Sequence, residues 1–139
     1  MSALYQATGV AIGGRGVLIE GPPGSGKSSL ALALIDRGAQ LIGDDGVLLA
    51  LREGRLLLSP APATAGLIEV RNVGLVPCPA VSDVAAVLVL RLDPDAPRFV
   101  EAAEGYALLG ATLPLIRLWP ETPVLALRAE SALARFGLD

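Results

Sequence analysis

One short glycine-rich segment constrains the fold of this chain more than any other part of it. Residues 21–28 are Gly-Pro-Pro-Gly-Ser-Gly-Lys-Ser and match the pattern G-x-x-x-x-G-K-[ST], between an apolar run at 17–20 and a helix-forming stretch at 28–37. In such a strand–loop–helix unit the glycines let backbone N–H groups turn toward an anion, and the start of the helix presents further free N–H groups to it. The segment therefore predicts a phosphate-binding loop (P-loop) in an α/β domain.

Two side chains of this loop are expected to carry the chemistry. Lys27 is expected to reach the β- and γ-phosphates of a nucleotide, and the Ser28 hydroxyl is placed to ligand Mg²⁺. Phosphoryl transfer needs little covalent help from the protein, so this positioning is much of the catalysis. The predicted nucleotide-binding residues are Gly21, Pro22, Pro23, Gly24, Ser25, Gly26, Lys27, Ser28 and Ser29.

The composition of the chain narrows the possible fold classes and partners. The 139 residues suit one domain, 1–139, and 53% of them are hydrophobic but only 4% aromatic, which favours buried aliphatic strands with flanking helices. The net charge of −3 without a basic stripe argues against a nucleic-acid partner, and the absence of histidine excludes histidine catalysis. No stretch approaches the ~20 apolar residues of a membrane span, and the first residues lack a signal-peptide pattern. We therefore expect a cytoplasmic protein without a membrane partner.

Hydrophobic patterns predict the order of the elements. Short strands are expected at 17–20 and 40–43, a hairpin at 47–51 and 55–58, a loop at 59–65 and a strand at 67–76. The longest apolar run, 84–92, predicts the strongest strand. A pair of strands around Gly110 is expected within 106–118, and a closing helix at 124–136. The predicted fold is a mixed sheet with flanking helices.

Two acidic positions follow the P-loop helix, and each has two interpretations. Asp44 and Asp45 end the strand at 40–43, where a carboxylate can hold Mg²⁺ or accept a proton from an attacking hydroxyl, but Asp-Asp-Gly is also ordinary turn chemistry. On one strand at 67–76, Glu69 and Arg71 would share a face. There they either complete a metal shell and orient phosphate, or form a surface ion pair.

Taken together, these motifs resemble the catalytic domain of HPr kinase/phosphorylase. The resemblance rests on the P-loop, on Asp44-Asp45 and on Leu-Ile-Glu-Val-Arg-Asn-Val-Gly at 67–74, in that order, and it runs over nearly the whole chain. It implies a P-loop domain similar to that of phosphoenolpyruvate carboxykinase. It also implies an ATP- and Mg²⁺-dependent kinase acting on a serine of HPr, the phosphocarrier of bacterial phosphotransferase systems. The sequence shows nothing like the family's usual N-terminal domain, as in the short form described in alphaproteobacteria.

The resemblance assigns roles to individual residues. Lys27 matches the catalytic lysine, and Ser28 and Glu69 match magnesium ligands. Asp45 matches the aspartate that takes the proton from the substrate serine, and it is also expected to contribute to the metal site. Asp44 matches its acidic neighbour. The remaining implied catalytic positions are Arg71, on the signature strand, Arg98, beyond the long strand, and Gln6, where the family has a histidine.

The departures from the family pattern keep three functions open. Gln6 can hydrogen-bond a phosphate oxygen but cannot shuttle a proton, Asn72 replaces a signature glycine, and Trp-Pro-Glu-Thr at 119–122 aligns with an Arg-Pro-Gly-Arg stretch tied to dephosphorylation. The kinase half is therefore expected to be better preserved than the phosphorylase half. The alternatives are a catalytically impaired nucleotide-binding regulator and a P-loop kinase or hydrolase of a small molecule. A homo-oligomer is left open.

Overall fold

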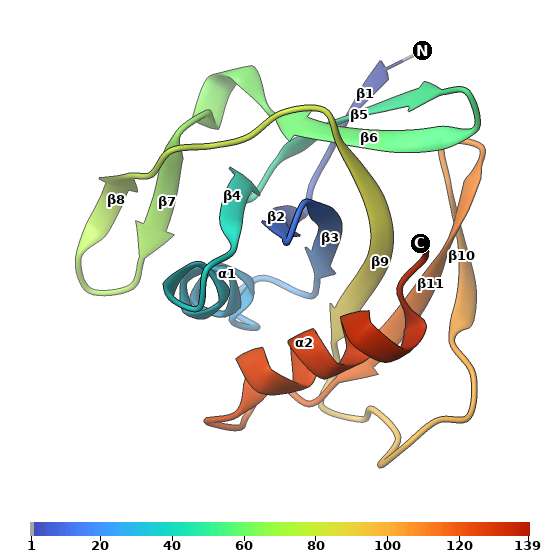
Figure 1. The fold of residues 1–139 in the computed structure, drawn as a ribbon. Helices are drawn as coiled ribbons and strands as arrows, with labels where there is room; N and C mark the ends of the chain where they lie inside the picture. Colours follow the sequence, from blue (N-terminus) through green and yellow to red (C-terminus); the bar gives the residue numbers. More distant parts are fainter. Residues whose placement is uncertain (1) are drawn as a thin grey trace.

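The structure of the chain is a computed structural model that describes residues 2–139. These residues form a nine-stranded sheet, a separate two-stranded hairpin and two α-helices (Figure 1). The strands are β1 (Ser2–Tyr5), β2 (Thr8–Ile12), β3 (Arg15–Glu20), β4 (Gln40–Gly43), β5 (Val47–Arg52), β6 (Arg55–Pro60), β7 (Leu67–Val70), β8 (Gly74–Pro77), β9 (Val84–Leu92), β10 (Glu104–Leu108) and β11 (Ala111–Leu118). The helices are α1 (Lys27–Asp36), α2 (Leu125–Phe136) and a 3-10 turn, η1 (Pro62–Thr64).

The longest strand, β9, connects the parts of the sheet. It pairs in parallel with β3 on one side and with β11 toward its carboxyl end, and it pairs antiparallel with β6 at its start. The order of the main path is β1-β5-β6-β9-β3-β2-β4, with β10 joined through β11. The sheet is therefore mixed. Because β3 and β9 are parallel, the loops that follow both strands leave the same edge of the sheet.

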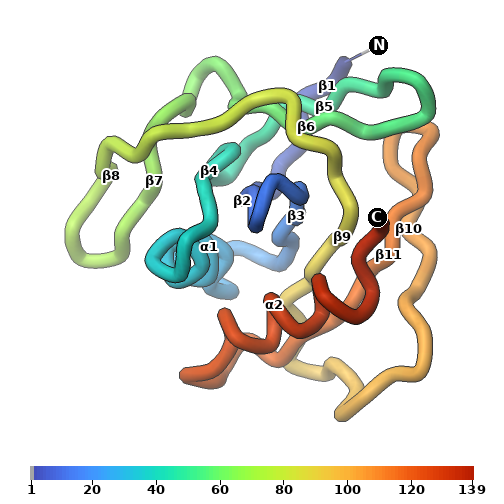
Figure 2. The backbone as a smooth tube through the Cα atoms, viewed as in Figure 1, coloured from blue at the N-terminus to red at the C-terminus, as the bar shows by residue number. Residues whose placement is uncertain are grey.

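The sheet curls, and each of its faces buries a core of its own (Figure 1). On one face α1, α2 and the β7–β8 hairpin cover a cluster that includes Leu34, Leu90 and Leu133. On the other face β5, β6 and β11 close over a cluster that includes Leu18, Leu58 and Leu115. The tube in Figure 2 shows the β7–β8 hairpin standing at the edge of the molecule beside α1. The predicted mixed sheet with flanking helices is confirmed.

The secondary structure predicted for two segments is wrong. Residues 67–76 are not one strand but a hairpin, because Asn72 and Gly74 adopt left-handed backbone angles and the Val73 N–H donates to the Val70 carbonyl. Glu69 thus lies on β7 and Arg71 lies in the turn. The loop predicted at 59–65 begins later, since Ser59 and Pro60 extend β6 along β5. The strands β1 and β2 were not predicted.

No helix among residues 2–139 is long and apolar enough to cross a bilayer.

The central position of β9 predicts that substitutions in its buried side chains lower the free energy of unfolding. Leu90 is fully buried, whereas Leu4 on β1 is 71% exposed. Leu90→Ala is expected to lower the free energy of unfolding by about 2–5 kcal/mol, because it removes buried methyl groups and leaves a cavity. Leu4→Ala, the matched control, is expected to change it by less than about 0.5 kcal/mol. Urea denaturation followed by circular dichroism measures both, and equal losses would contradict the assigned core.

Candidate active site

The P-loop leaves β3 at Glu20 and enters α1 at Lys27. A side chain at its first position would crowd the loop, because a Cβ on Gly21 would lie 2.5 Å from the Ser25 hydroxyl oxygen and 3.2 Å from the Leu92 Cβ. Gly26, with φ of 103°, precedes the helix, and no side chain of residues 2–139 caps this end of α1. The N–H groups of the first helical turn therefore remain free for a ligand.

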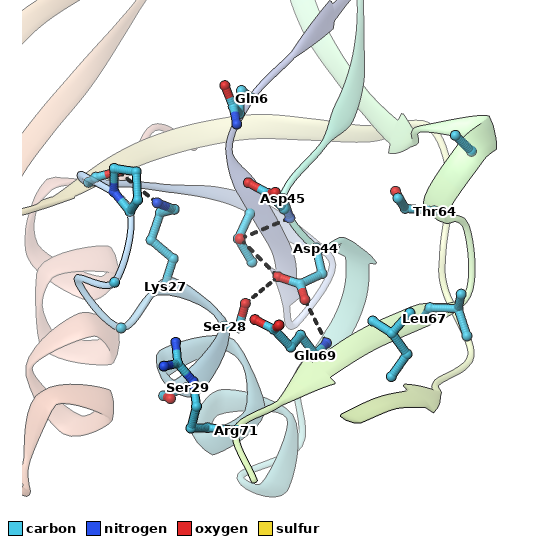
Figure 3. Close-up of a pocket in the computed structure, with 17 residues that line it drawn as sticks. Gln6, Lys27, Ser28, Ser29, Asp44, Asp45, Thr64, Leu67, Glu69 and Arg71 are labelled. Carbon is cyan, nitrogen blue, oxygen red and sulfur yellow. Dashed lines mark hydrogen bonds between the residues drawn. The ribbon is translucent and has the colours of Figure 1, made fainter. Parts of the chain in front are cut away.

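Lys27 lies along its own loop. Its ammonium group donates to the carbonyl oxygens of Gly21, at 2.7 Å, and Pro22, at 3.2 Å. These contacts hold the cation at the rim of the cavity in which Ser28 and Ser29 also lie (Figure 3). If a phosphate entered that cavity, its anionic oxygens would replace the two carbonyl oxygens as acceptors for the Lys27 ammonium group.

Asp44 ties three segments of the site together (Figure 3). Its Oδ1 accepts hydrogen bonds from the Ser28 hydroxyl at 2.6 Å and the Thr8 hydroxyl at 3.2 Å, and its Oδ2 accepts from the Glu69 backbone N–H at 2.7 Å. The carboxylate is only 6% exposed. The hydrogen bonds satisfy it inside the protein and fix the P-loop helix, β2 and β7 relative to one another.

Asp45 is the exposed member of the pair. It adopts a left-handed conformation with φ of 55°, which aspartate tolerates better than most residues, and its N–H donates to the Thr8 hydroxyl at 3.3 Å. The turn is tight, because a Cβ on Gly43 would lie 2.3 Å from the Gly46 carbonyl oxygen. Asp44 and Asp45 therefore form a turn, and the same turn lies at the cavity. The two interpretations of the acidic pair are thus compatible with each other.

Glu69 and Arg71 approach the same cavity from the opposite side. Both side chains line it, although one comes from β7 and the other from the turn after it. Within residues 2–139 they form no ion pair with each other or with another residue. In Figure 3 the Glu69 side chain points toward Ser28 and Asp44. The arrangement therefore leaves a carboxylate and a guanidinium available to a ligand.

These groups surround one cavity of about 550 Å³. Gln6 lies at its rim and completes the set of predicted residues that the cavity brings together. Pro22, Ser25 and Arg98 are not among them. Pro22 lines a neighbouring hollow, and Arg98 lines a separate hollow with Trp119 beside α2. Sequence reasoning missed Thr8, Thr64, Leu67 and Leu75, which also line the cavity. Isolated threonines and leucines in a sequence carry no signal for such a role.

The charges of the cavity favour a bound cation alongside any phosphate. Three carboxylates, Asp44, Asp45 and Glu69, face two cations, Lys27 and Arg71. A nucleotide polyphosphate entering alone would meet an excess of negative charge, whereas Mg²⁺ prefers oxygen ligands from carboxylates, hydroxyls and phosphates. The Ser28 hydroxyl and the Glu69 carboxylate are oxygen donors of this kind. Phosphate oxygens would have to complete the shell of a Mg²⁺ ion, because residues 2–139 hold no group of three or more acidic, cysteine or histidine side chains that could bind a metal alone.

A second polar network lies at the end of β3, directly before the P-loop. Glu20, directly before Gly21, is 8% exposed and accepts hydrogen bonds from Arg91, at 2.6 Å, and from the Tyr5 hydroxyl. Tyr5 also contacts the Tyr106 hydroxyl at 2.8 Å. Burial and the hydrogen bond to Glu20 raise the pKa of the Tyr5 phenol well above its usual range, so Tyr5 is a protonated donor at neutral pH. The network joins β1, β3, β9 and β10 at the base of the P-loop.

The fold and this site define a class of protein, the P-loop domains that hold phosphate groups at a strand–loop–helix junction. Comparison with known sequences and structures specifies the class further. The sequence model of the HPr Serine kinase C-terminal domain family matches residues 2–88. The chain therefore belongs to the HPr kinase C-terminal domain family.

Individual relatives agree with this family. The chain is 41% identical over 78 residues to an HPr kinase/phosphorylase of Clostridium tetani and 47% identical over 68 residues to one of Streptococcus thermophilus. These regions cover 56% and 48% of the chain but only 26% and 22% of the relatives, so the match spans about a quarter of their length. The structure of the Hpr(Ser) kinase/phosphatase from Coxiella burnetii superimposes with a TM-score of 0.84 at 28% identity, covering 95% of this chain and 88% of that one.

The buried position of Asp44 makes the second prediction. In Asp44→Asn one side-chain oxygen becomes an NH₂ group, which donates and does not accept, so either the Ser28 hydroxyl or the Glu69 N–H loses its acceptor. An unpaired buried donor costs ~1–3 kcal/mol. We expect a loss of that size in the free energy of unfolding. Asp45→Asn, the matched control one residue away, is expected to change it by less than about 0.5 kcal/mol. Thermal and urea denaturation measure both, and a neutral Asp44→Asn would contradict the anchoring role.

Proposed function

We propose that this chain is a single HPr kinase-like catalytic domain over residues 1–139, which uses ATP and Mg²⁺ to phosphorylate a serine of HPr or an HPr-like phosphocarrier. The observation that supports it most is the convergence of Lys27, Ser28, Asp45 and Glu69 on one cavity at the P-loop of a chain in this family. A cytoplasmic location follows from the proposed partner.

The nucleotide end of the reaction uses the loop. The backbone of residues 21–26 and the first turn of α1 bind the phosphates, and Lys27 neutralises negative charge on the transferred group. Ser28 and Glu69, with Asp45 beside them, would hold Mg²⁺, which supplies positive charge to the phosphate oxygens when bound. Asp44 accepts the Ser28 hydrogen bond and so orients that hydroxyl.

The acceptor end uses Asp45. Its exposed carboxylate accepts the proton of the incoming serine hydroxyl while the serine oxygen forms a bond to the γ-phosphorus and the bond to the ADP oxygen breaks. Arg71 and Gln6 lie at the rim, where a guanidinium and an amide can donate to phosphate oxygens. Asp45 is the only carboxylate of this acceptor set, so the forward reaction depends on it.

The reverse reaction, phosphorolysis, is proposed to be weak or absent. A neutral Gln6 lies at the rim of the cavity, and Trp119 of the segment tied to dephosphorylation lines a different hollow. The cavity therefore gains no added positive charge for inorganic phosphate from either position.

Transfer of the label from γ-labelled ATP to the HPr of the same genome tests the proposal. With Mg²⁺ we expect label on a serine, and we expect Lys27→Ala to reduce the rate by at least about a hundredfold, because it removes a cation from the transferred phosphoryl group. Arg55→Ala, which removes an exposed cation on β6 outside the cavity, is the matched control and should retain the rate within about threefold. ATP binding without transfer would favour the nucleotide-binding regulator, and turnover without any protein acceptor would favour a small-molecule kinase or hydrolase.

A fourth prediction isolates the proton acceptor. Asp45→Asn keeps the shape and the backbone conformation of the side chain but removes its basicity. The variant is expected to bind ATP with the parental affinity within about threefold and to transfer phosphate at least about a hundredfold more slowly, because general base catalysis of this kind is worth roughly 10²–10⁴ in rate. Calorimetry and the transfer assay measure the two quantities. Transfer at the parental rate would exclude Asp45 as the base.

A further inference from the structure

A second hollow, of about 490 Å³, lies against one face of α2, away from the P-loop cavity. One wall is the segment 97–100 between β9 and β10, the floor is the end of β11, and the other wall is the face of α2 that carries Arg128 and Arg135. Figure 1 shows that segment and α2 on the same lower side of the molecule. We call this hollow the arginine groove.

The groove carries a strong positive charge on a chain whose net charge is −3. Arg98, Arg128 and Arg135 line it, and no ion pair neutralises any of them within residues 2–139. No acidic side chain of the described chain lines the groove. Arg117 also reaches it, but Asp93 and Glu104 pair with that guanidinium. Three arginines therefore gather where no carboxylate of residues 2–139 pairs with them.

Apolar side chains fill the space between the arginines. Phe99 is 77% exposed and Trp119 is 40% exposed, and Ile116, Ala132 and Phe136 also line the groove. The Trp119 indole N–H donates to the Ala96 carbonyl at 2.5 Å. This hydrogen bond holds the Trp119 side chain to the segment between β9 and β10, opposite α2. The Arg128 guanidinium lies 5.8 Å from the centre of the Trp119 ring. A mixed surface of aromatic side chains and arginine is the composition enriched at protein interfaces.

We propose that the arginine groove binds an acidic segment of a partner protein that carries a leucine or aromatic side chain for the apolar floor. Arg128 and Arg135 are seven residues apart, hence about 10 Å along the helix axis at 1.5 Å per residue. Arg98 stands on the opposite wall. Charges placed this far apart on two walls match several separated carboxylates along a peptide better than one compact anion.

The groove also has a defined relation to the P-loop cavity. Arg117 lines both the groove and a further hollow of about 570 Å³, and that hollow shares Gln6 and Gly21 with the P-loop cavity. One intervening hollow therefore separates the groove from the P-loop cavity. Binding in the groove does not require phosphoryl transfer, so it stands or falls independently of the proposed function.

The first test selects ligands without assuming a partner. Random displayed peptides of about twelve residues, which at ~3.3 Å per residue extend past both arginines of α2, are enriched on the full chain. We expect the selected sequences to combine Asp or Glu with leucine or an aromatic residue and to be lost on Arg128→Glu. No enrichment, or sequences without acidic residues, would overturn the proposal.

The second test measures binding of a selected peptide through Trp119, the only tryptophan of the chain. Titration should change the Trp119 fluorescence, and Arg128→Glu or Arg98→Glu should each weaken binding by about tenfold. Arg55→Glu on β6, outside the groove, is the matched control and should leave the affinity unchanged. Circular dichroism checks that each variant is folded.

Other occupants give other results. Self-association by sedimentation that Arg128→Glu abolishes would assign the groove to a second copy of this chain. A Trp119 shift with phosphatidylserine vesicles of the same size as with the peptide would assign it to a membrane surface. Either result would overturn the proposal, as would a peptide affinity that does not fall with added salt, because exposed charge pairs are screened.

Discussion

The carboxylate of Asp44 is the interaction on which the arrangement of the site depends. It is buried, yet it accepts from Ser28 on the P-loop helix, Thr8 on β2 and the Glu69 N–H on β7. A buried charge is tolerated only when hydrogen bonds replace its water, so these donors have to be in place in the folded chain. Because the three donors come from separate elements, one side chain sets the distance between the phosphate loop and the strand that carries Glu69.

The loop itself depends on a second constraint at its base. Glu20 ends β3 and pairs with Arg91 directly across the parallel ladder to β9, and Tyr5 closes the network from β1. The end of the strand before Gly21 is thereby held by side chains from two other strands, whereas the Lys27 ammonium group at the far end of the loop donates to two backbone carbonyls. The entry of the loop therefore depends on long-range contacts, and the position of its cation depends on the loop itself.

Local patterns in the sequence predicted the parts of this structure whose signal is contiguous. The apolar run of β9, the P-loop and the acidic pair after β4 are each visible within ten residues. The β7–β8 hairpin escaped because its turn residues Asn72 and Gly74, both left-handed, lie between apolar residues that also fit one continuous strand. The contacts of Thr8 and Tyr5 escaped because their partners are more than ten residues away, and only pairing of the strands brings them together. Arg98 was grouped with the P-loop residues by resemblance, and the packing of its segment on α2 places it in the arginine groove instead.

The central claim is that the cavity around Lys27, Asp44 and Glu69 is a site for ATP with Mg²⁺. Calorimetric titration of the chain with ATP, in excess Mg²⁺ and in excess EDTA, tests it most directly. Because three carboxylates line the cavity, binding is predicted with Mg²⁺ and is predicted to weaken by at least about tenfold without it. Equal affinity in Mg²⁺ and in EDTA, or no binding in either, would contradict the account.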